Sequence, residues 1–132
     1  MLVNRAKLTF RDFGYKKSEE KDFYIEFDKS ILANRTKYSS GNGYNSLEYT
    51  VFQSQYPLLI RLQENSVISR YKKYMHFKQE KTNLPSNIKV YFASSSNFIV
   101  LVSEDKVIFI VKMLSLSSDE FLDIAYKKFF TQ

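Results

Sequence analysis

The side chains with the clearest chemical signature lie between residues 70 and 89. Six lysines and arginines fall in this window against one acid, Glu80, so the window carries most of the chain's net charge of +6. Tyrosine and phenylalanine rings are interleaved with these cations. Cations attract phosphates and rings stack on bases, which is how a groove for single-stranded nucleic acid is built. The candidate binding residues are Arg70, Lys72, Lys73, Tyr74, His76, Lys78, Lys81 and Lys89.

Other interpretations of this window stay open. A solvated basic strand with its aromatic side in the core would have the same composition. A protein partner with an acidic surface, or an anionic membrane surface, would also be attracted by the excess positive charge. On a strand, Tyr71 and Phe77 would share one face and Tyr74 would point to the other, so the three rings would not line a single groove.

The residues needed for catalysis are scarce. The chain has no cysteine, which excludes disulfides, thiolate zinc sites and cysteine nucleophiles, and His76 is its single histidine. No serine lies in a Gly-x-Ser-x-Gly turn, and residues 39–44 contain two glycines but lack the lysine of a P-loop. Pairs of carboxylates such as Glu26 and Asp28 are common in a chain with 14 acids. We therefore expect no enzymatic activity, no cofactor and no metal.

The elements that must position this window are mainly strands. Residues 67–78 fit either a helix or a strand, and the β-propensity of tyrosine and phenylalanine favours a strand. Residues 34–46 are expected to form the longest loop, because glycine and asparagine there adopt the positive φ of tight turns. Alternating or continuous apolar patterns predict further strands at residues 7–13, 23–28, 47–53, 58–62 and 88–93.

The C-terminal forty residues have the most regular pattern. Residues 98–102 and 107–111 are continuously apolar around a polar turn, which predicts a central hairpin with both faces covered. A helix should follow, with Ser117 as its N-cap and Glu120 three residues later as in a capping box. Its helical spacing places four side chains in the core: Phe121, Leu122, Ala125 and Phe129.

These elements predict an α+β fold, with an antiparallel sheet of about five to seven strands and a C-terminal helix packed on one face. We expect one domain over residues 1–132, with an ordered core at about 7–130. Residues 1–10 lack the apolar stretch of a signal peptide, and residues 103–106 interrupt the longest apolar run with three charges. No transmembrane segment is expected.

Residues 88–130 resemble the C-terminal half of a small domain of unknown function. That domain occurs in Gram-positive extracytoplasmic proteins, namely anti-sigma-factor-like membrane regulators and lipoproteins. The shared pattern is a strand, a turn, a strand and then Leu-Ser-x-x-Glu-hydrophobic-x-x-Ile-Ala, which here runs from Leu116 to Ala125. The family usually carries an aromatic residue, often tryptophan, near its middle strand, and this chain has no tryptophan. The resemblance implies a bacterial, non-enzymatic sensing or scaffolding domain.

The sequence therefore predicts a non-enzymatic binding or regulatory module, the soluble part of an extracytoplasmic lipoprotein-like protein, with a protein or an anionic surface as its partner. The alternative is a small basic protein, nucleic-acid-binding or accessory to a mobile element, that uses the patch at residues 70–89. An export signal upstream of Met1 would place the protein outside the cytoplasm, and a start at Met1 would leave it inside.

Overall fold

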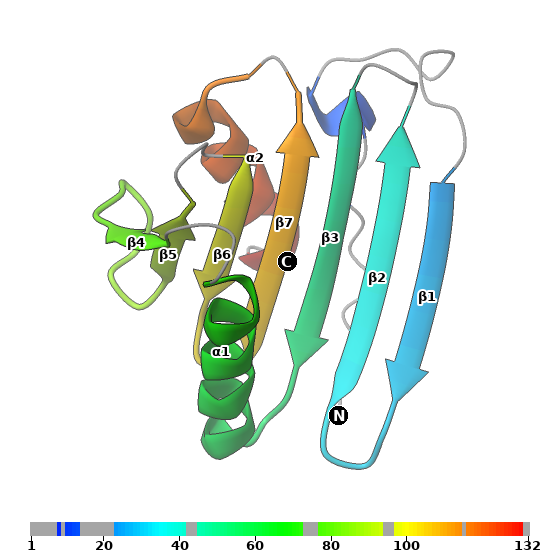
Figure 1. Cartoon of the computed structure of the whole chain (residues 1–132), viewed down its shortest axis with the longest axis vertical. Coiled ribbons are helices and arrows are strands. Elements are labelled where there is room, and N and C mark those ends of the chain that lie inside the picture. The colour runs from blue at the N-terminus through cyan, green and yellow to red at the C-terminus, as the bar shows by residue number, and fades with distance from the viewer. Residues whose placement is uncertain are drawn as a thin grey trace.

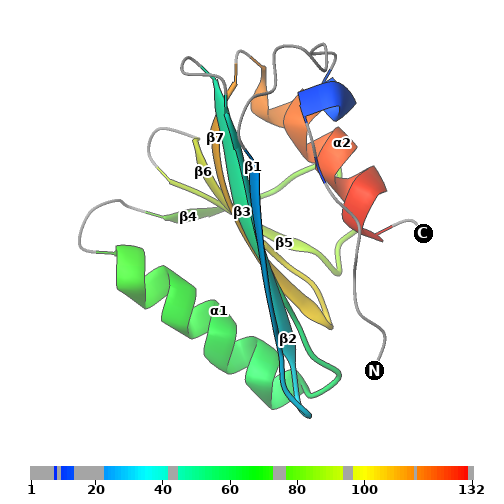
Figure 2. The ribbon, with the colours of Figure 1, turned by 90° about the vertical axis from the view of Figure 1, so that its right-hand side faces the viewer.

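In the described part of the chain, a seven-stranded antiparallel sheet with one α-helix on each face forms the framework of the protein (Figure 1, Figure 2). The computed structural model describes residues 8, 10–13, 23–41, 45–72, 77–93, 97–114 and 116–130. Helix α1 lies on one face of the sheet, and the C-terminal helix α2 lies on the other (Figure 2). This arrangement confirms the predicted α+β class and the C-terminal helix packed on the sheet.

The strand order is β1-β2-β3-β7-β6-β5-β4, and all neighbouring strands are antiparallel. The strands β1, β2 and β3 form a meander at one side, and β7 pairs with β3 to join this meander to the remaining strands. The strands are β1 (Phe23–Lys29), β2 (Asn34–Gly41), β3 (Ser46–Gln53), β4 (Lys78–Glu80), β5 (Lys89–Phe92), β6 (Phe98–Val102) and β7 (Lys106–Met113). The helices are the 3-10 helix η1 (Phe10–Phe13), α1 (Pro57–Tyr71) and α2 (Ser118–Phe130).

The β6–β7 hairpin forms the predicted central pair of strands. Because side chains alternate between the two faces of a strand, Ile99 and Ile108 belong to the core beneath α2, whereas Val100 and Val107 belong to the core beneath α1. Both faces are thus covered, which explains why these strands are apolar at nearly every position.

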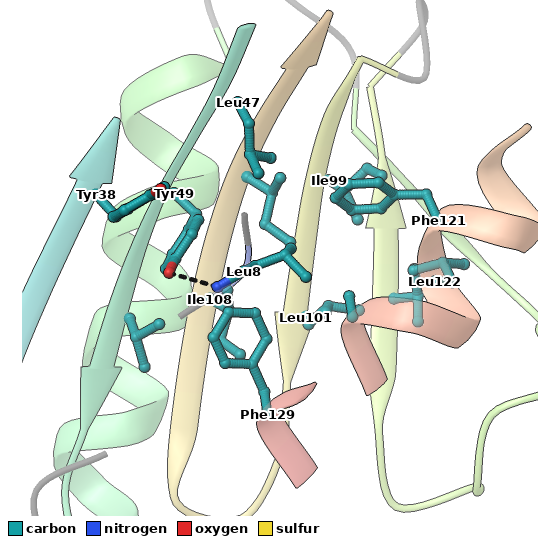
Figure 3. Close-up of a cluster of buried hydrophobic side chains, with 14 of the residues drawn as sticks. Leu8, Tyr38, Leu47, Tyr49, Ile99, Leu101, Ile108, Phe121, Leu122 and Phe129 are labelled. Carbon is teal, nitrogen blue, oxygen red and sulfur yellow. Dashed lines mark hydrogen bonds between the residues drawn. The ribbon is translucent and has the colours of Figure 1, made fainter. Parts of the chain in front are cut away.

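The larger core lies between the sheet and α2 (Figure 3). Tyr49 of β3 is at its centre, stacked on Tyr38 at 5.2 Å between ring centroids and edge-on to Phe129 at 5.3 Å. The Leu8 N–H donates a hydrogen bond of 2.9 Å to the Tyr49 hydroxyl, which ties the N-terminal segment to the sheet. Burial holds the pKa of Tyr49 well above its usual range, because the phenolate would be desolvated there.

Helix α2 has the start and the buried face that its sequence predicts. The Ser117 hydroxyl accepts a hydrogen bond of 3.2 Å from the Glu120 N–H, which is the expected N-cap. The four predicted core side chains, Phe121, Leu122, Ala125 and Phe129, are all buried.

Two segments differ from the sequence prediction, one near the N-terminus and one at β2. The strand predicted at residues 7–13 is wrong over Phe10–Phe13, which forms η1 and stacks Phe13 on Phe121 at 5.0 Å. The loop predicted at residues 34–46 is wrong over β2, since β2 pairs with β1 on one side and β3 on the other. Pairing on both sides outweighs the weak strand propensity of its serines and asparagine. Residues 42–44 of the predicted loop lie outside the described part of the chain.

Helix α1 contradicts two further predictions. The strand predicted at residues 58–62 is helical, with Pro57 in the first turn, where proline needs no hydrogen-bond partner for its nitrogen. The strand favoured at residues 67–78 is also wrong over residues 67–71, which complete α1, whereas β4 begins at Lys78. Residues 73–76 lie outside the described residues.

Candidate functional site

A groove of about 210 Å³ lies between α1 and the face of strands β2, β3 and β7. The lining residues from the strands form its floor, and those from α1 form one wall. Figure 1 shows α1 in front of the sheet. The residues that line it are Arg35, Lys37, Thr50, Phe52, Gln63, Val67, Arg70, Tyr71, Val107 and Phe109.

Strand register brings the floor residues together. Arg35 and Lys37 share one face of β2 because they are two residues apart, and their partners across β3 are Phe52 and Thr50. Thr50 in turn pairs with Phe109 of β7. The wall forms in the same way, because helix residues three and four apart lie on one side, as in the series Gln63, Val67 and Arg70.

The groove is cationic. Arg35, Lys37 and Arg70 line it, and none of the ten described lining residues is an acid. The Arg35 guanidinium donates a hydrogen bond of 3.2 Å to Gln63 Oε1 and lies 5.5 Å from the centroid of the Phe52 ring. Lys37 Nζ lies 3.9 Å from Glu48 Oε1, and both side chains are nearly half exposed. Exposed pairs at this distance are weak. In the strand register, the β1 partners of Lys37 and Arg35 are the acids Glu26 and Asp28.

The aromatic rings of the groove already have partners inside the protein. Tyr71 stacks on Phe109 with 4.6 Å between ring centroids and 9° between ring planes. Arg35 covers Phe52. These contacts favour a site that recognises charge over one that stacks flat bases.

A polar cluster anchors α1 on the sheet beside the groove. Glu64 of α1 is buried, and its carboxylate accepts hydrogen bonds from Lys89 Nζ at 2.7 Å and from the Tyr91 hydroxyl at 2.6 Å. Burial, together with the bond to Glu64, raises the pKa of Tyr91 to about 12. The anchor joins the middle of α1 to β5 and so helps to fix the distance between the wall and the floor of the groove.

The structure separates the cations predicted at residues 70–89. Arg70 lines the groove, and Lys72 is exposed just after α1. Lys89 is bound to Glu64 on the α1 face of the sheet, whereas Lys78 pairs with Phe92 and so points toward the other face. Lys81 borders a separate, open depression of about 530 Å³ between β4 and the turn before β5. The remaining candidates, Lys73, Tyr74 and His76, lie outside the described residues.

Sequence analysis missed Arg35 and Lys37 because their segment was assigned to a loop. The signal that could have located them is the alternation of Arg35 and Lys37 with Thr36 and Tyr38, a period of two that is typical of a half-buried strand. Tyr38 is indeed buried beneath the opposite face.

Comparisons with protein-family models, with curated proteins and with solved structures found no match to this chain. Within the described residues, neither α1 nor α2 has the length and apolar character needed to cross a membrane. The same residues contain no group of three or more side chains that could hold a metal ion.

Proposed function

We propose that this protein is a non-enzymatic binding module that holds an acidic, extended segment of a protein partner in the groove between α1 and β2. The supporting observation is the convergence of Arg35, Lys37 and Arg70 on a groove whose described lining contains no acid. The resemblance of residues 88–130 to extracytoplasmic regulators and lipoproteins agrees with a regulatory role of this kind.

The spacing of the cations matches an extended peptide. Alternate residues of a strand are about 6.6 Å apart, so Arg35 and Lys37 lie at the repeat of every second side chain in an extended ligand. Arg70 faces the same space from the helix wall. Arginine binds carboxylates through paired, charge-assisted hydrogen bonds, which makes Arg35 and Arg70 suited to carboxylate-bearing side chains.

Single-stranded nucleic acid is the competing ligand, and it fits the groove less well. Binding of bases requires aromatic faces that are free for stacking. Phe52, Tyr71 and Phe109 are instead engaged by Arg35 or by each other. The dispersal of Arg70, Lys78 and Lys89 also removes the continuous basic path that a nucleic-acid backbone would follow.

The test is fluorescence anisotropy with a labelled octapeptide of alternating glutamate and threonine. Lys37→Gln combined with Arg70→Gln should weaken binding about tenfold or more, since a charge-assisted hydrogen bond contributes about 1.5–3 kcal/mol. The matched control is Lys78→Gln with Lys81→Gln, which removes the same charge outside the groove and should change affinity less than threefold.

Two results would contradict the proposal. Equal weakening by both double variants would show that the protein attracts acids only through its net charge. Tighter binding of an oligothymidine than of the peptide, with equal sensitivity to both double variants, would favour the nucleic-acid alternative. Urea denaturation of each variant establishes that lost binding does not reflect unfolding.

A further inference from the structure

The two edges of the sheet differ in how well they are protected against a further strand. At one edge β4 is only three residues long, and Lys78, Gln79 and Glu80 are all exposed. Short, charged edge strands resist pairing with another chain. At the other edge β1 has seven residues, no proline and an unbroken register with β2 (Figure 1). Within the described part of the chain no strand pairs with the outer side of β1, which we call the β1 edge (Phe23–Lys29).

The strand register shows which backbone groups of the β1 edge point outward. The Ser30 N–H donates to the Ala33 carbonyl at 2.8 Å, so these two residues form a hydrogen-bonded pair at the start of the hairpin. Hydrogen-bonded and non-hydrogen-bonded pairs alternate along an antiparallel ladder. Asp28, Glu26 and Tyr24 therefore exchange backbone hydrogen bonds with β2. The residues between them direct their N–H and C=O groups outward, and these are Phe23, Ile25, Phe27 and Lys29.

The existing partner of β1 indicates which side chains suit a second neighbour. In the register with β2, Arg35 is opposite Asp28 and Lys37 is opposite Glu26. On the open side the same two acids occupy non-hydrogen-bonded positions, where opposed residues lie closest together. Opposite charges on directly opposed residues stabilise a strand pair, and like charges destabilise it. A strand with a lysine or arginine at every second position therefore matches the β1 edge.

We propose that the β1 edge binds an extended, basic segment of a protein partner as an added strand antiparallel to β1. Main-chain hydrogen bonds supply the affinity, and the alternate cations supply the specificity. All neighbouring strands of the sheet are antiparallel, which favours this direction for the added strand. A second copy of the chain fits less well, because antiparallel pairing of two β1 strands over their full length places Glu26 opposite Glu26. The proposal does not rest on the function proposed for the groove, whose described lining includes no residue of β1.

The first test is fluorescence anisotropy with the labelled heptapeptide Thr-Lys-Val-Lys-Val-Lys-Thr. In the antiparallel register two of its lysines oppose Glu26 and Asp28, and its valine N–H groups point to the β1 edge. N-methylation of both valines should weaken binding about tenfold or more, because the donors are lost. N-methylation of the two opposed lysines is the matched control and should change affinity less than about threefold, since their N–H groups point away from β1. Equal binding by the two methylated peptides would overturn the inference.

Variants of the protein provide the second measurement. Ile25→Pro removes an outward N–H and keeps the pairing with β2, because proline is tolerated on an edge strand at such a position. It should weaken binding of the unmethylated peptide about fivefold or more. Glu26→Gln with Asp28→Asn should also weaken it about fivefold. The matched control, Glu80→Gln with Glu104→Gln, removes the same charge at exposed sites elsewhere and should change affinity less than about twofold.

Three results from these variants would overturn the inference. Equal weakening by both double variants would mean that the peptide is attracted only by charge in general. Unchanged binding by an Ile25→Pro variant that urea denaturation shows to be folded would mean that the β1 edge is not the site. Self-association that Ile25→Pro abolishes, without peptide binding, would replace the partner segment by a second copy of the chain. If Ile25→Pro does not fold, the methylated peptides decide the question with the wild-type protein.

Discussion

Lys112 shows how one residue of the core acts on stability. It is 3% exposed on β7, beneath the start of α2, and its ammonium donates a long hydrogen bond of 3.5 Å to the Leu116 carbonyl. The same group lies 5.6 Å from the centroid of the Phe121 ring. Desolvation by burial lowers the pKa of Lys112. The folded state therefore binds this proton less tightly than the unfolded chain does.

Lys112→Met should raise the free energy of unfolding at pH 7 by about 1–3 kcal/mol, the cost of an incompletely paired buried donor. A depressed lysine pKa makes the wild type gain stability as pH rises from the folded pKa toward the ordinary value of about 10.4. The advantage of the variant should therefore shrink across that range. Urea denaturation of both proteins at several pH values measures this difference in stability. Tyr49 and Tyr91 are present in both proteins, so their contributions to the pH dependence cancel. If the extra stability of Lys112→Met did not change with pH, the lowered pKa of Lys112 would be contradicted.

A helix or strand of this protein can be predicted from the sequence when its apolar pattern matches the burial of its side chains in the fold. Strands β6 and β7 and helix α2 were predicted correctly because their apolar pattern coincides with their burial. Helix α1 was not, because Leu58 and Leu62 on its outer face cancel the amphipathic pattern made by Ile60 and Val67. The groove was missed for the same reason, since it depends on α1 and β2, the two elements that were assigned wrongly.

The cap and the core of α2 offer a prediction at this scale. Ser117→Ala should lower the free energy of unfolding by about 1 kcal/mol, because the Glu120 N–H loses its acceptor. Phe121→Ala should lower it by roughly 3–5 kcal/mol through the cavity left beside Phe13. Ser118→Ala is the matched control for the cap and should stay within about 0.5 kcal/mol of the wild type. A cap variant as stable as this control in urea denaturation would refute the capping role.

In the whole molecule, one sheet separates two cores of unequal size. Among the described residues, the core beneath α2 contains sixteen buried side chains, including Tyr49 and Phe121, whereas the core beneath α1 contains five. Helix α1 is further held by Glu64, through Lys89 and Tyr91. Opening of α1 would leave the larger core intact, so α1 should open at a lower free energy than the rest of the fold.

Native-state hydrogen exchange should resolve this order of opening. Amides of α1 should exchange through local opening, and those of β6 and β7 through global unfolding. Ile99→Val removes one methyl from the core beneath α2, at a cost of about 0.5–1.5 kcal/mol. Its contacts persist when α1 opens, so it should speed exchange of β6 and β7 about two- to tenfold and leave α1 unchanged. The contacts of Val67 are lost both when α1 opens locally and when the whole protein unfolds. Val67→Ala should therefore speed amide exchange in α1, β6 and β7. Faster exchange of α1 in Ile99→Val would mean that both cores open together, and the helix wall of the groove would then be as stable as the sheet itself.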